Sequence, residues 1–342
     1  MASINLQARE VSIAVAVKLL RRYIEKRRST MLWGAPGIGK SAIVYQLAAE
    51  LTWKVIDFRA NIREPVDVRG IPVADLKSGT TRWLSPDELP QVARDGECGI
   101  LFIDEINTAS PQMMAVLMQL ILERRCGEYT LPEGWVIVAA GNRVSDRAAA
   151  QKMPTALRNR FAHIHVIPDV KAWRDWANAN GVSQELVAFI AFRQDFLHVM
   201  PKADESSFPT PRSWVAAGDF VDEPADLRVL LMGGCVGDAY ASEFDAFIDL
   251  YRTIGTLDGV VANPDTAPVP DEPSIKYATC VGLGRIATRQ NLGNIIKYAK
   301  RLSREFEVLV VTDAATRDPK LKDTSAYGRW AVDNADITAQ AA

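Results

Sequence analysis

Apolar residues along the first half of the chain follow two different periodicities. Residues 9–27 carry apolar positions at nearly helical spacing with charged positions mostly opposite, which predicts an amphipathic helix. Short apolar runs of strand length follow, at residues 29–33, 54–59, 99–103, 135–140 and 162–167. Helical periodicity lies between some of these runs, over residues 42–49 and 111–123. Strands that alternate with helices predict a mainly parallel α/β sheet flanked by helices.

Turn-forming residues interrupt this pattern at three places. Residues 60–98 hold prolines and glycines at intervals, so they cannot form one uninterrupted helix. Residues 124–131 predict a hairpin that turns at Gly127 and Glu128. Residues 263–273 carry four prolines in eleven residues, which predicts an extended loop.

The pattern changes to helices alone after Pro168. We expect these helices near residues 170–180, 183–198, 212–221, 225–252 and 289–307. The change predicts a domain boundary, with an α/β domain over residues 1–168 and an all-α domain over residues 169–342. A chain of 342 residues is long enough to bury a core in each domain.

Composition and charge argue against several classes of protein. The net charge of −2 gives no overall attraction to nucleic acid or to an anionic membrane. The four cysteines lack C-x-x-C spacing, so a reducing compartment is expected. His163 and His165 alternate on a predicted strand, and we interpret them as ordinary strand residues rather than as a pair of metal ligands. No apolar run has the length of a membrane span, and Arg9 and Glu10 precede the first apolar stretch, unlike a signal peptide. These features predict a cytoplasmic protein.

Between the first apolar run and the helix that follows it, residues 34–41 fit the pattern G-x-x-x-x-G-K-[ST]. The glycines allow successive backbone N–H groups to turn inward around an anion, because side chains there would fill the space. Lys40 would place its ammonium against the terminal phosphates, and the Ser41 hydroxyl would hold Mg²⁺. The predicted nucleotide-binding residues are Gly34, Ala35, Pro36, Gly37, Ile38, Gly39, Lys40, Ser41 and Ala42.

Two carboxylates stand at the end of the apolar run 99–103. This run is wholly apolar, as expected of a parallel strand buried on both faces, and Asp104 and Glu105 follow it directly. Open α/β sheets bind their ligands at the carboxyl ends of their strands. Asp104 is therefore expected to complete the Mg²⁺ shell and Glu105 to polarise an attacking water.

With these residues, the chain resembles the AAA+ ATPases, and within them the MoxR-like group of the helix-2-insert clade, a dynein-related type. The resemblance covers about residues 9–215, and the segment Asp-Glu-Ile-Asn at 104–107 is similar to the D-E-I-N of MoxR-like proteins. It implies a P-loop AAA+ core over residues 1–168 and, over residues 169–342, a helical lid with a C-terminal extension. It further implies that Glu105 is the catalytic base and that Asn142 is a polar sensor that positions the water.

The resemblance also implies roles for three arginines. The segment 156–161 looks like the arginine-finger segment that reaches a neighbouring subunit's nucleotide, with Arg160 as the first choice and Arg158 as the second. Thr210 and Pro211 predict the start of a helix, and Arg212 then lies in the first turn, where the helix dipole disfavours a cation. Arg212 is therefore expected to face an anion, as the second sensor arginine of the family does.

Some features depart from the family or stay open. Thr108-Ala109 follows the D-E-I-N segment where Arg-Ala is usual, and Gly-Asn-Arg ends the sensor strand in place of Gln-Asn-Pro, which leaves the subfamily and the client open. Residues 61–83 match the place where this clade inserts structure. Four charged residues there fit a central pore or partner surface and a solvated loop equally well, namely Arg63, Glu64, Asp67 and Arg69.

The sequence thus predicts a Mg²⁺-dependent ATP hydrolase that assembles, by resemblance, as a hexameric ring. MoxR-like proteins commonly act as chaperones that remodel a partner complex, often with a protein that has a von Willebrand factor A domain. The alternative is a nucleic-acid motor or loader of the same fold, against which the net acidity argues. A binding switch with little hydrolysis would not need Glu105, and no acceptor site for a small-molecule kinase is evident.

Overall fold

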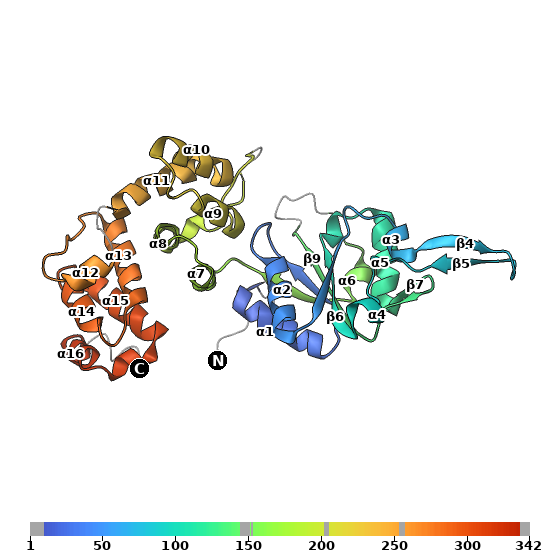
Figure 1. Ribbon diagram of the computed structural model, residues 1–342, viewed down its shortest axis with the longest axis horizontal. Helices are drawn as coiled ribbons and strands as arrows, with labels where there is room; N and C mark the ends of the chain where they lie inside the picture. Colours follow the sequence, from blue (N-terminus) through green and yellow to red (C-terminus); the bar gives the residue numbers. More distant parts are fainter. Residues whose placement is uncertain (1–9, 144–150, 152, 202–204, 253–256, 336–342) are drawn as a thin grey trace. The chain divides into compact units, whose positions relative to one another are not determined.

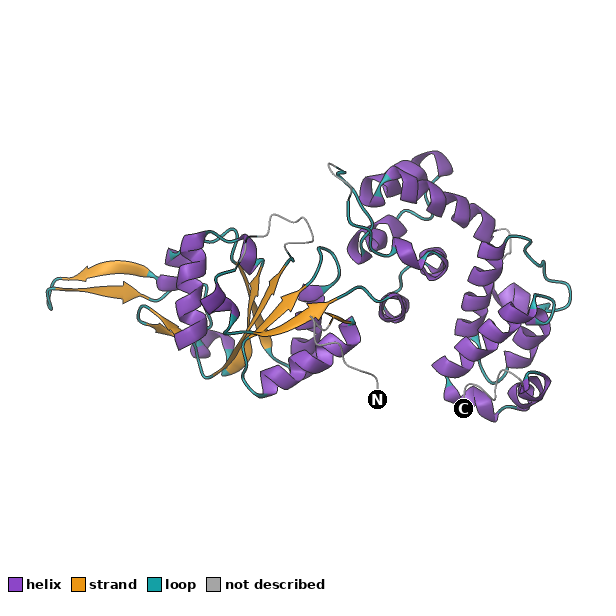
Figure 2. Cartoon of the chain, turned by 180° about the vertical axis from the view of Figure 1, so that it is seen from behind, coloured by secondary structure: helices purple, strands orange, loops and turns teal. Residues whose placement is uncertain are grey.

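The computed structural model describes the chain except residues 1–9, 144–150, 152, 202–204, 253–256 and 336–342. It divides into two compact units, residues 1–172 and residues 173–342, and each is described by itself. The first unit contains a sheet with helices packed on it, and the second is built of helices (Figures 1 and 2). The predicted fold class, a parallel sheet flanked by helices and followed by a helical region, is confirmed.

Six parallel strands form the main sheet, in the order β1-β10-β2-β9-β6-β3. Their bounds are β1 Glu10–Val11, β2 Thr30–Trp33, β3 Lys54–Arg59, β6 Cys98–Asp104, β9 Gly134–Gly141 and β10 Ala162–Val166. Strands β2 and β6 lie on either side of β9, so the carboxyl ends of these three strands meet at one edge. The predicted P-loop follows β2 and the two carboxylates end β6, and both therefore lie at this edge.

Helices cover both faces of the sheet, which explains the continuous apolar runs. On one face, α1 (Ile13–Glu25) and α2 (Lys40–Leu51) pack on the strands, and Tyr45 of α2 meets Phe102 of β6 edge to face. On the other face, Leu101 and Ile103 of β6 belong to a buried cluster with residues of α5 (Pro111–Glu123). Helix α5 begins where predicted because the Ser110 hydroxyl accepts from the Met113 N–H and Pro111 takes the first helical position.

The segment between β3 and β6 is ordered. It holds α3 (Val66–Arg69), an antiparallel hairpin of β4 (Ile71–Asp75) and β5 (Thr80–Leu84), and α4 (Val92–Asp95). The hairpin projects from the body of the first unit (Figures 1 and 2). A second, shorter hairpin of β7 (Arg125–Cys126) and β8 (Tyr129–Thr130) has the predicted position and turn. Residues 61–83 therefore form a short helix and a hairpin rather than an irregular loop, and most of these residues are exposed.

The charged residues of this insertion stabilise its base. Arg63 pairs with Glu88 at 2.7 Å, and the Glu64 N–H donates to the Asp67 carboxylate at 3.0 Å. The Arg69 guanidinium lies over the Trp83 ring, 4.3 Å from its centroid. These contacts leave open whether the hairpin also meets a partner.

The second unit consists of helices throughout the part that the structure describes. They are α7 Val170–Ala179, which spans the division, α8 Gln184–Phe192, α9 Pro211–Gly218, α10 Ala225–Val236, α11 Asp238–Arg252, α12 Leu257–Ala262, α13 Pro273–Ile286, α14 Leu292–Ala299, α15 Arg304–Arg317 and α16 Ser325–Asp333. The predicted loop at 263–273 is confirmed up to Pro273, which is the first residue of α13.

Several predicted boundaries are wrong. The helix expected over 225–252 is two helices, because Gly237 adopts a left-handed φ of 91° and its N–H closes α10 on the Gly233 carbonyl. The helix expected over 183–198 ends at Phe192, after which Arg193 (φ −104°, ψ 68°) leaves helical geometry and η3 (Gln194–Phe196) adds a short turn.

Other differences concern whole elements. The pattern over 289–307 covers α14 and only the start of α15, with a turn at residues 300–303 between them, and α12, α13 and α16 were not predicted. Within the predicted helix 9–27, Glu10 and Val11 form a strand that pairs with His165 and Val166 of β10. Arg9 lies outside the described residues. A two-residue edge strand has no periodicity that would separate it from the helix that follows.

Candidate functional site

The loop after β2 has the backbone geometry of an anion cradle. Gly37 and Gly39 adopt left-handed φ angles of 75° and 98°, which side chains rarely tolerate. Gly34 has no room for a side chain, because a Cβ atom there would lie 2.4 Å from Ile38 Cδ1 and 2.8 Å from the Val166 carbonyl oxygen. The three glycines of the motif are therefore each required by local sterics.

The Lys40 ammonium is buried under this loop. Its side chain begins α2, the residue is only 9% exposed, and Nζ donates to the carbonyl oxygens of Gly34 at 2.7 Å and Ala35 at 2.9 Å. It also donates to Asn142 Oδ1 at 2.9 Å. A buried ammonium is stable only when oxygen atoms satisfy its donors, and phosphate oxygens are the acceptors that this loop is shaped to receive. The structure thus brings together Lys40 and Asn142, which stand 102 positions apart in the sequence.

Ser41 and Asp104 provide two adjacent oxygen atoms beside the loop. Ser41 Oγ donates to Asp104 Oδ2 at 3.1 Å, and the other oxygen of this carboxylate accepts from the Glu105 N–H at 2.9 Å. Hydroxyl and carboxylate oxygens are the ligands that Mg²⁺ prefers, and this ion needs only one or two carboxylates when phosphates supply further ligands. These two residues fit the predicted Mg²⁺ site. Within the described residues, no group of three or more His, Cys, Asp or Glu side chains is placed to hold a metal by itself.

Glu105 is held in an uncommon backbone conformation. It adopts a left-handed φ of 53°, and its carboxylate accepts a short hydrogen bond from the Asn61 side-chain amide. Its carbonyl oxygen accepts from the Thr108 hydroxyl at 2.9 Å. Such strain in a non-glycine residue persists only where the surroundings enforce it. Asn61 was not among the predicted site residues. Its position, as a polar residue shortly after the end of a neighbouring parallel strand, could have indicated a place near Glu105.

A buried asparagine fixes the end of the sensor strand. Asn107 lies in η1 (Ile106–Thr108), is fully buried, and donates from Nδ2 to the Asn142 carbonyl oxygen at 2.7 Å. A Cβ atom on Gly141 would lie 2.4 Å from Asn107 Oδ1, so the strand end can approach only because Gly141 has no side chain. Asn107 is the last residue of the D-E-I-N segment, and the sequence predicted no role for it. Its side chain links the turn after Glu105 to Asn142, whose own side chain meets Lys40.

The two finger candidates lie close together on the surface of the first unit. Arg158 is the last residue of α6 (Thr155–Arg158), Arg160 follows in the next turn, and both residues are exposed. A cavity of about 790 Å³ lies beside this segment, at the carboxyl end of β2 and β10. Its wall includes Trp33, Arg143, Arg158, His163 and His165. The structure does not decide between Arg158 and Arg160.

Arg212 lies in the second unit. Thr210 caps α9, its hydroxyl accepting from the Ser213 N–H at 3.0 Å, and Pro211 opens the helix as predicted. Arg212 is exposed in the first turn of that helix. The predicted helix start is confirmed, and the contact with a phosphate stays a prediction.

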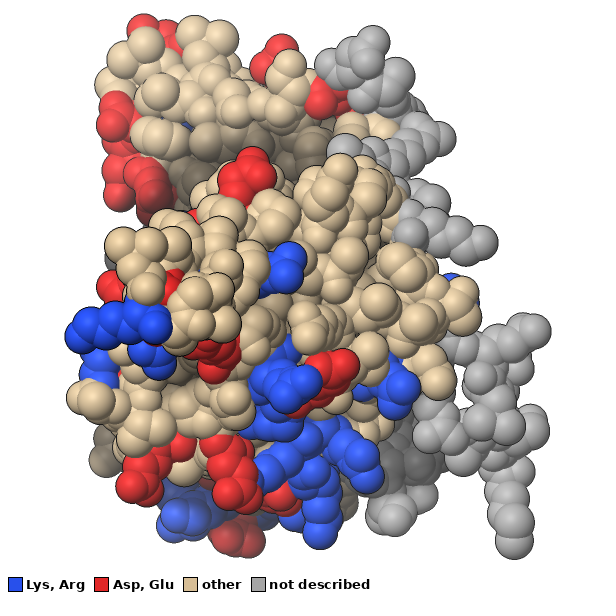
Figure 3. All heavy atoms as spheres, turned by 90° about the vertical axis from the view of Figure 1, so that its right-hand side faces the viewer, with Lys and Arg blue, Asp and Glu red and all other residues tan. Residues whose placement is uncertain are grey.

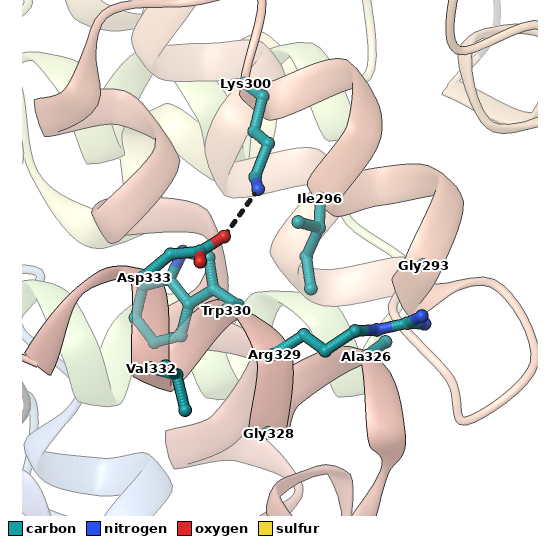
Figure 4. A pocket seen from close by; sticks show the side chains of 9 residues that line it. All are labelled: Gly293, Ile296, Lys300, Ala326, Gly328, Arg329, Trp330, Val332 and Asp333. Carbon is teal, nitrogen blue, oxygen red and sulfur yellow. Dashed lines mark hydrogen bonds and ion pairs between the residues drawn. The ribbon is translucent and has the colours of Figure 1, made fainter.

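A second cavity belongs wholly to the second unit. It has a volume of about 480 Å³ and is lined by residues of α14 and α16 together with Lys300 (Figure 4). Lys300 Nζ donates to the Asp333 carboxylate at 2.9 Å at its edge, so this cation is already paired. Nothing in the chemistry of this cavity parallels that of the loop after β2.

Within the described part of the chain, every helix is too short or too polar to reach across a lipid bilayer.

One family model covers the part of the chain that holds this geometry. Residues 29–161 match the family model described as AAA domain (dynein-related subfamily). The chain is 32% identical to Protein MoxR of Methylorubrum extorquens over 168 residues, which is 45% of this chain and 46% of that protein. It is 27% identical to Midasin of Giardia intestinalis over 162 residues, 45% of this chain and 3% of Midasin. The chain thus spans less than half the length of these curated relatives. A solved structure of the Thermotoga maritima RuvB Holliday junction branch migration motor is 18% identical, covers 80% of both chains and has a TM-score of 0.40.

Proposed function

We propose that the protein is an AAA+ ATPase of the MoxR-like type, which hydrolyses ATP with Mg²⁺ as a ring of identical subunits and thereby remodels a protein partner. The match of residues 29–161 to the AAA domain (dynein-related subfamily) and the similarity to Protein MoxR support this proposal. The observation that carries the proposal is the convergence of Lys40, Asn142, Ser41, Asp104 and Glu105 at the carboxyl ends of three adjacent strands. Lys40 is hydrogen-bonded to Asn142, and Asp104 is hydrogen-bonded to Ser41 and to the Glu105 N–H, so cation, metal-binding oxygens and carboxylate base stand at one edge of the sheet.

Each residue of the cluster has a definite task in this mechanism. The loop N–H groups and Lys40 bind the phosphates, and ATP takes over the acceptor positions that loop carbonyls hold in the structure. Ser41 and Asp104 would hold Mg²⁺, which would supply positive charge to neutralise the phosphates. Glu105 orients the attacking water and accepts its proton, and Asn142 fixes the Lys40 ammonium.

The cluster holds no arginine, although such a cation commonly stabilises the transferring phosphoryl group. Arg160, with Arg158 as the second candidate, is exposed and is proposed to reach the nucleotide of the neighbouring subunit. Arg212 is proposed to meet the γ-phosphate. A ring, hexameric by resemblance to MoxR-like proteins, brings each finger to the next site.

The experiment that tests this function is ATP turnover per subunit as a function of protein concentration, with Mg²⁺ present. We expect turnover to rise from near zero to a plateau, because fingers supplied in trans are worth about 10³–10⁵ in rate. A monomer that hydrolyses ATP at a high rate independent of concentration, with its mass checked at the same dilution, would refute a site shared between subunits. No turnover at any concentration would refute the ATPase assignment.

A protein partner is supported by the β4–β5 hairpin. Leu76 at its turn is 93% exposed, and the cross-strand neighbours Ile71 and Leu84 are each 60% exposed. A two-stranded hairpin is only marginally stable in water, and apolar side chains of this size favour contact with another protein surface. We propose a client with a von Willebrand factor A domain, in the cytoplasm, where the four free cysteines stay reduced. The test is whether such a protein changes the ATPase rate.

The alternative client is a nucleic acid. On the face in Figure 3, Asp and Glu atoms lie beside and among the Lys and Arg atoms, which does not make the continuous basic surface that phosphate backbones require. The net charge of −2 agrees with this arrangement. Strong stimulation of the ATPase by DNA at moderate salt would reverse the ranking of the two client classes.

A further inference from the structure

We propose that His163 is a positioning residue that holds the finger segment of each subunit in place, by joining it to the strand that carries the same subunit's P-loop. The inference rests on the proposed function, since it concerns the presentation of Arg158 or Arg160 to a neighbouring subunit. The feature that carries it is a chain of two hydrogen bonds, Trp33 to His163 to Arg158, in the wall of the cavity at the end of β2 and β10.

The hydrogen bonds determine which nitrogen of His163 carries the proton. Trp33 Nε1 lies 2.8 Å from His163 Nδ1, and an indole nitrogen can only donate, so Nδ1 accepts. In the neutral imidazole the proton is then on Nε2, which donates to the Arg158 carbonyl oxygen at 2.8 Å. The two rings are nearly parallel, with an interplanar angle of 20°. Only the neutral tautomer with Nε2–H satisfies both partners.

The finger segment needs this bond because its helix is short. Helix α6 comprises Thr155–Arg158, a single turn, and such a turn has little stability without tertiary contacts. The carbonyl oxygen of its last residue, Arg158, accepts a hydrogen bond from His163 Nε2. A side chain from another element thus caps the end of the helix. Asn159 and Arg160 follow directly. Leu157 and Phe161 anchor the segment in the core on either side, and the His163 bond fixes the Arg158 carbonyl between these anchors.

Trp33 connects this cap to the nucleotide loop. The residue ends β2 and directly precedes Gly34, whose N–H bonds to the Gly141 carbonyl oxygen at 3.3 Å. Strand β10, which carries His163, is paired with β2 through that whole strand, His165 lying opposite Trp33. The paired strands β2 and β10 thus hold both the loop that binds ATP and, through Trp33 and His163, the segment that carries the finger.

Arg143 and His165 line the same cavity as His163, and each contacts other residues. Arg143 donates to Glu10 at 2.6 Å and to the Val166 carbonyl oxygen at 2.9 Å. His165 stacks near Trp33, with centroids 6.3 Å apart, and its ring makes no hydrogen bond among the described residues. His165 is therefore a matched control, since it has the same chemistry on the same strand and face but no link to the finger segment.

The test compares three variants of the full chain above the concentration at which turnover reaches its plateau. We expect His163→Phe, which keeps a ring but removes both nitrogens, to lower kcat about 10- to 100-fold with KM for ATP unchanged, because small displacements of a catalytic group have effects of this size. His163→Gln, whose amide can still donate to the Arg158 carbonyl, should recover most of kcat. His165→Phe should have the turnover of the unaltered protein.

Mixing subunits separates a positioning role from a folding defect. Lys40→Ala subunits lack a working P-loop but have intact fingers, and His163→Phe subunits have the reverse. A mixture should therefore turn over ATP faster than the sum of the two alone, because some interfaces join an intact P-loop to an intact finger. Thermal unfolding midpoints for all variants check that the subunits are folded, and His163→Gln keeps the test decisive if His163→Phe unfolds.

Several outcomes would overturn the proposal. Unchanged kcat in His163→Phe, an equal loss in His165→Phe, no recovery in His163→Gln, or no gain on mixing would each contradict a positioning role. These results are distinct from a failure of the proposed function itself. In that case the unaltered protein would not hydrolyse ATP, or Arg158→Ala and Arg160→Ala would both leave turnover unchanged.

Discussion

At the scale of single residues, Glu105 shows how backbone and side chain are set together. It comes directly after the last residue of β6 and adopts a left-handed φ of 53°. The Asp104 carboxylate accepts a hydrogen bond from its N–H. The amide of Asn61, two residues after the end of the neighbouring strand β3, donates to its carboxylate. A carboxylate held by an amide is fixed in orientation, which a general base requires.

We predict that Glu105→Gln retains ATP binding and loses turnover by about 10²-fold or more, since general-base catalysis contributes about 10²–10⁴. The amide has nearly the shape of the carboxylate but cannot accept a proton from water. Steady-state turnover and the dissociation constant for ATP measure the two effects separately. The control is Glu97→Gln, an exposed glutamate just before β6, which should change neither. Turnover in Glu105→Gln equal to that of the unaltered protein would remove Glu105 from the mechanism.

At the scale of elements, the two hairpins of the first unit support each other. Gly127, in the turn between β7 and β8, has a left-handed φ of 59°, and a Cβ atom there would lie 2.9 Å from the Arg69 carbonyl oxygen. The neighbouring Glu128 carboxylate accepts from the Trp83 N–H at 3.2 Å, at the base of the projecting hairpin. The turn of one hairpin therefore sets the base of the other.

This contact predicts that Gly127→Ala lowers the free energy of unfolding by about 2–3 kcal/mol, from the left-handed backbone and the clash together. Gly79→Ala is the control, because Gly79 has a similar φ of 68° with nothing within 4 Å, and should cost about 1 kcal/mol. Urea unfolding of both variants gives the comparison. Equal losses in the two would show that the hairpins do not depend on this close approach.

A buried carboxylate joins α4 to the sheet. Asp95 accepts from Arg94 Nη2 at 2.8 Å, Lys54 Nζ at 2.6 Å and the Gln91 N–H at 2.9 Å. The hydrogen bonds from Arg94 above all hold the pKa of Asp95 well below its usual value of 3.8, although burial acts in the opposite direction. A depressed pKa in the folded protein gives stability that is present above the unfolded pKa and is lost as the pH falls below it.

We therefore expect the unfolding free energy of the unaltered protein to decrease as the pH is lowered from about 5 to 2. Asp95→Asn should reduce this dependence and should be less stable near neutral pH, by about 1–3 kcal/mol, because the buried site loses charge-assisted hydrogen bonds. Urea midpoints across this pH range test both effects. A pH dependence that is the same in Asp95→Asn and the unaltered protein would assign the acid sensitivity to other carboxylates.

At the scale of the whole molecule, the proposed site depends on more than one chain. The first unit holds the loop, the metal-binding oxygens and the base, whereas the arginines of the mechanism lie on an exposed turn and in the second unit. This division explains why turnover is expected to depend on protein concentration. For the same reason, we expect a substitution of His163 to lower turnover at the site of the neighbouring subunit.

The sequence by itself determined the features that depend on local backbone chemistry. The glycines of the loop and the Ser110–Pro111 helix start have steric and hydrogen-bonding requirements within a few residues, so their elements were found where they were predicted. The apolar run ending at Asp104 predicted a buried central strand for the same reason. These segments lie within residues 29–161, which match the AAA domain model.

Only the tertiary structure decided which distant side chains meet. Asn61 with Glu105, Asn107 with Asn142 and Trp33 with His163 each join residues far apart in sequence. No periodicity encodes these pairs, because they depend on strand order and on which face each side chain takes. The helical breaks in the second unit were missed for a related reason. A continuous apolar pattern favours one long helix, and only a single residue such as Gly237, in its left-handed conformation, ends it.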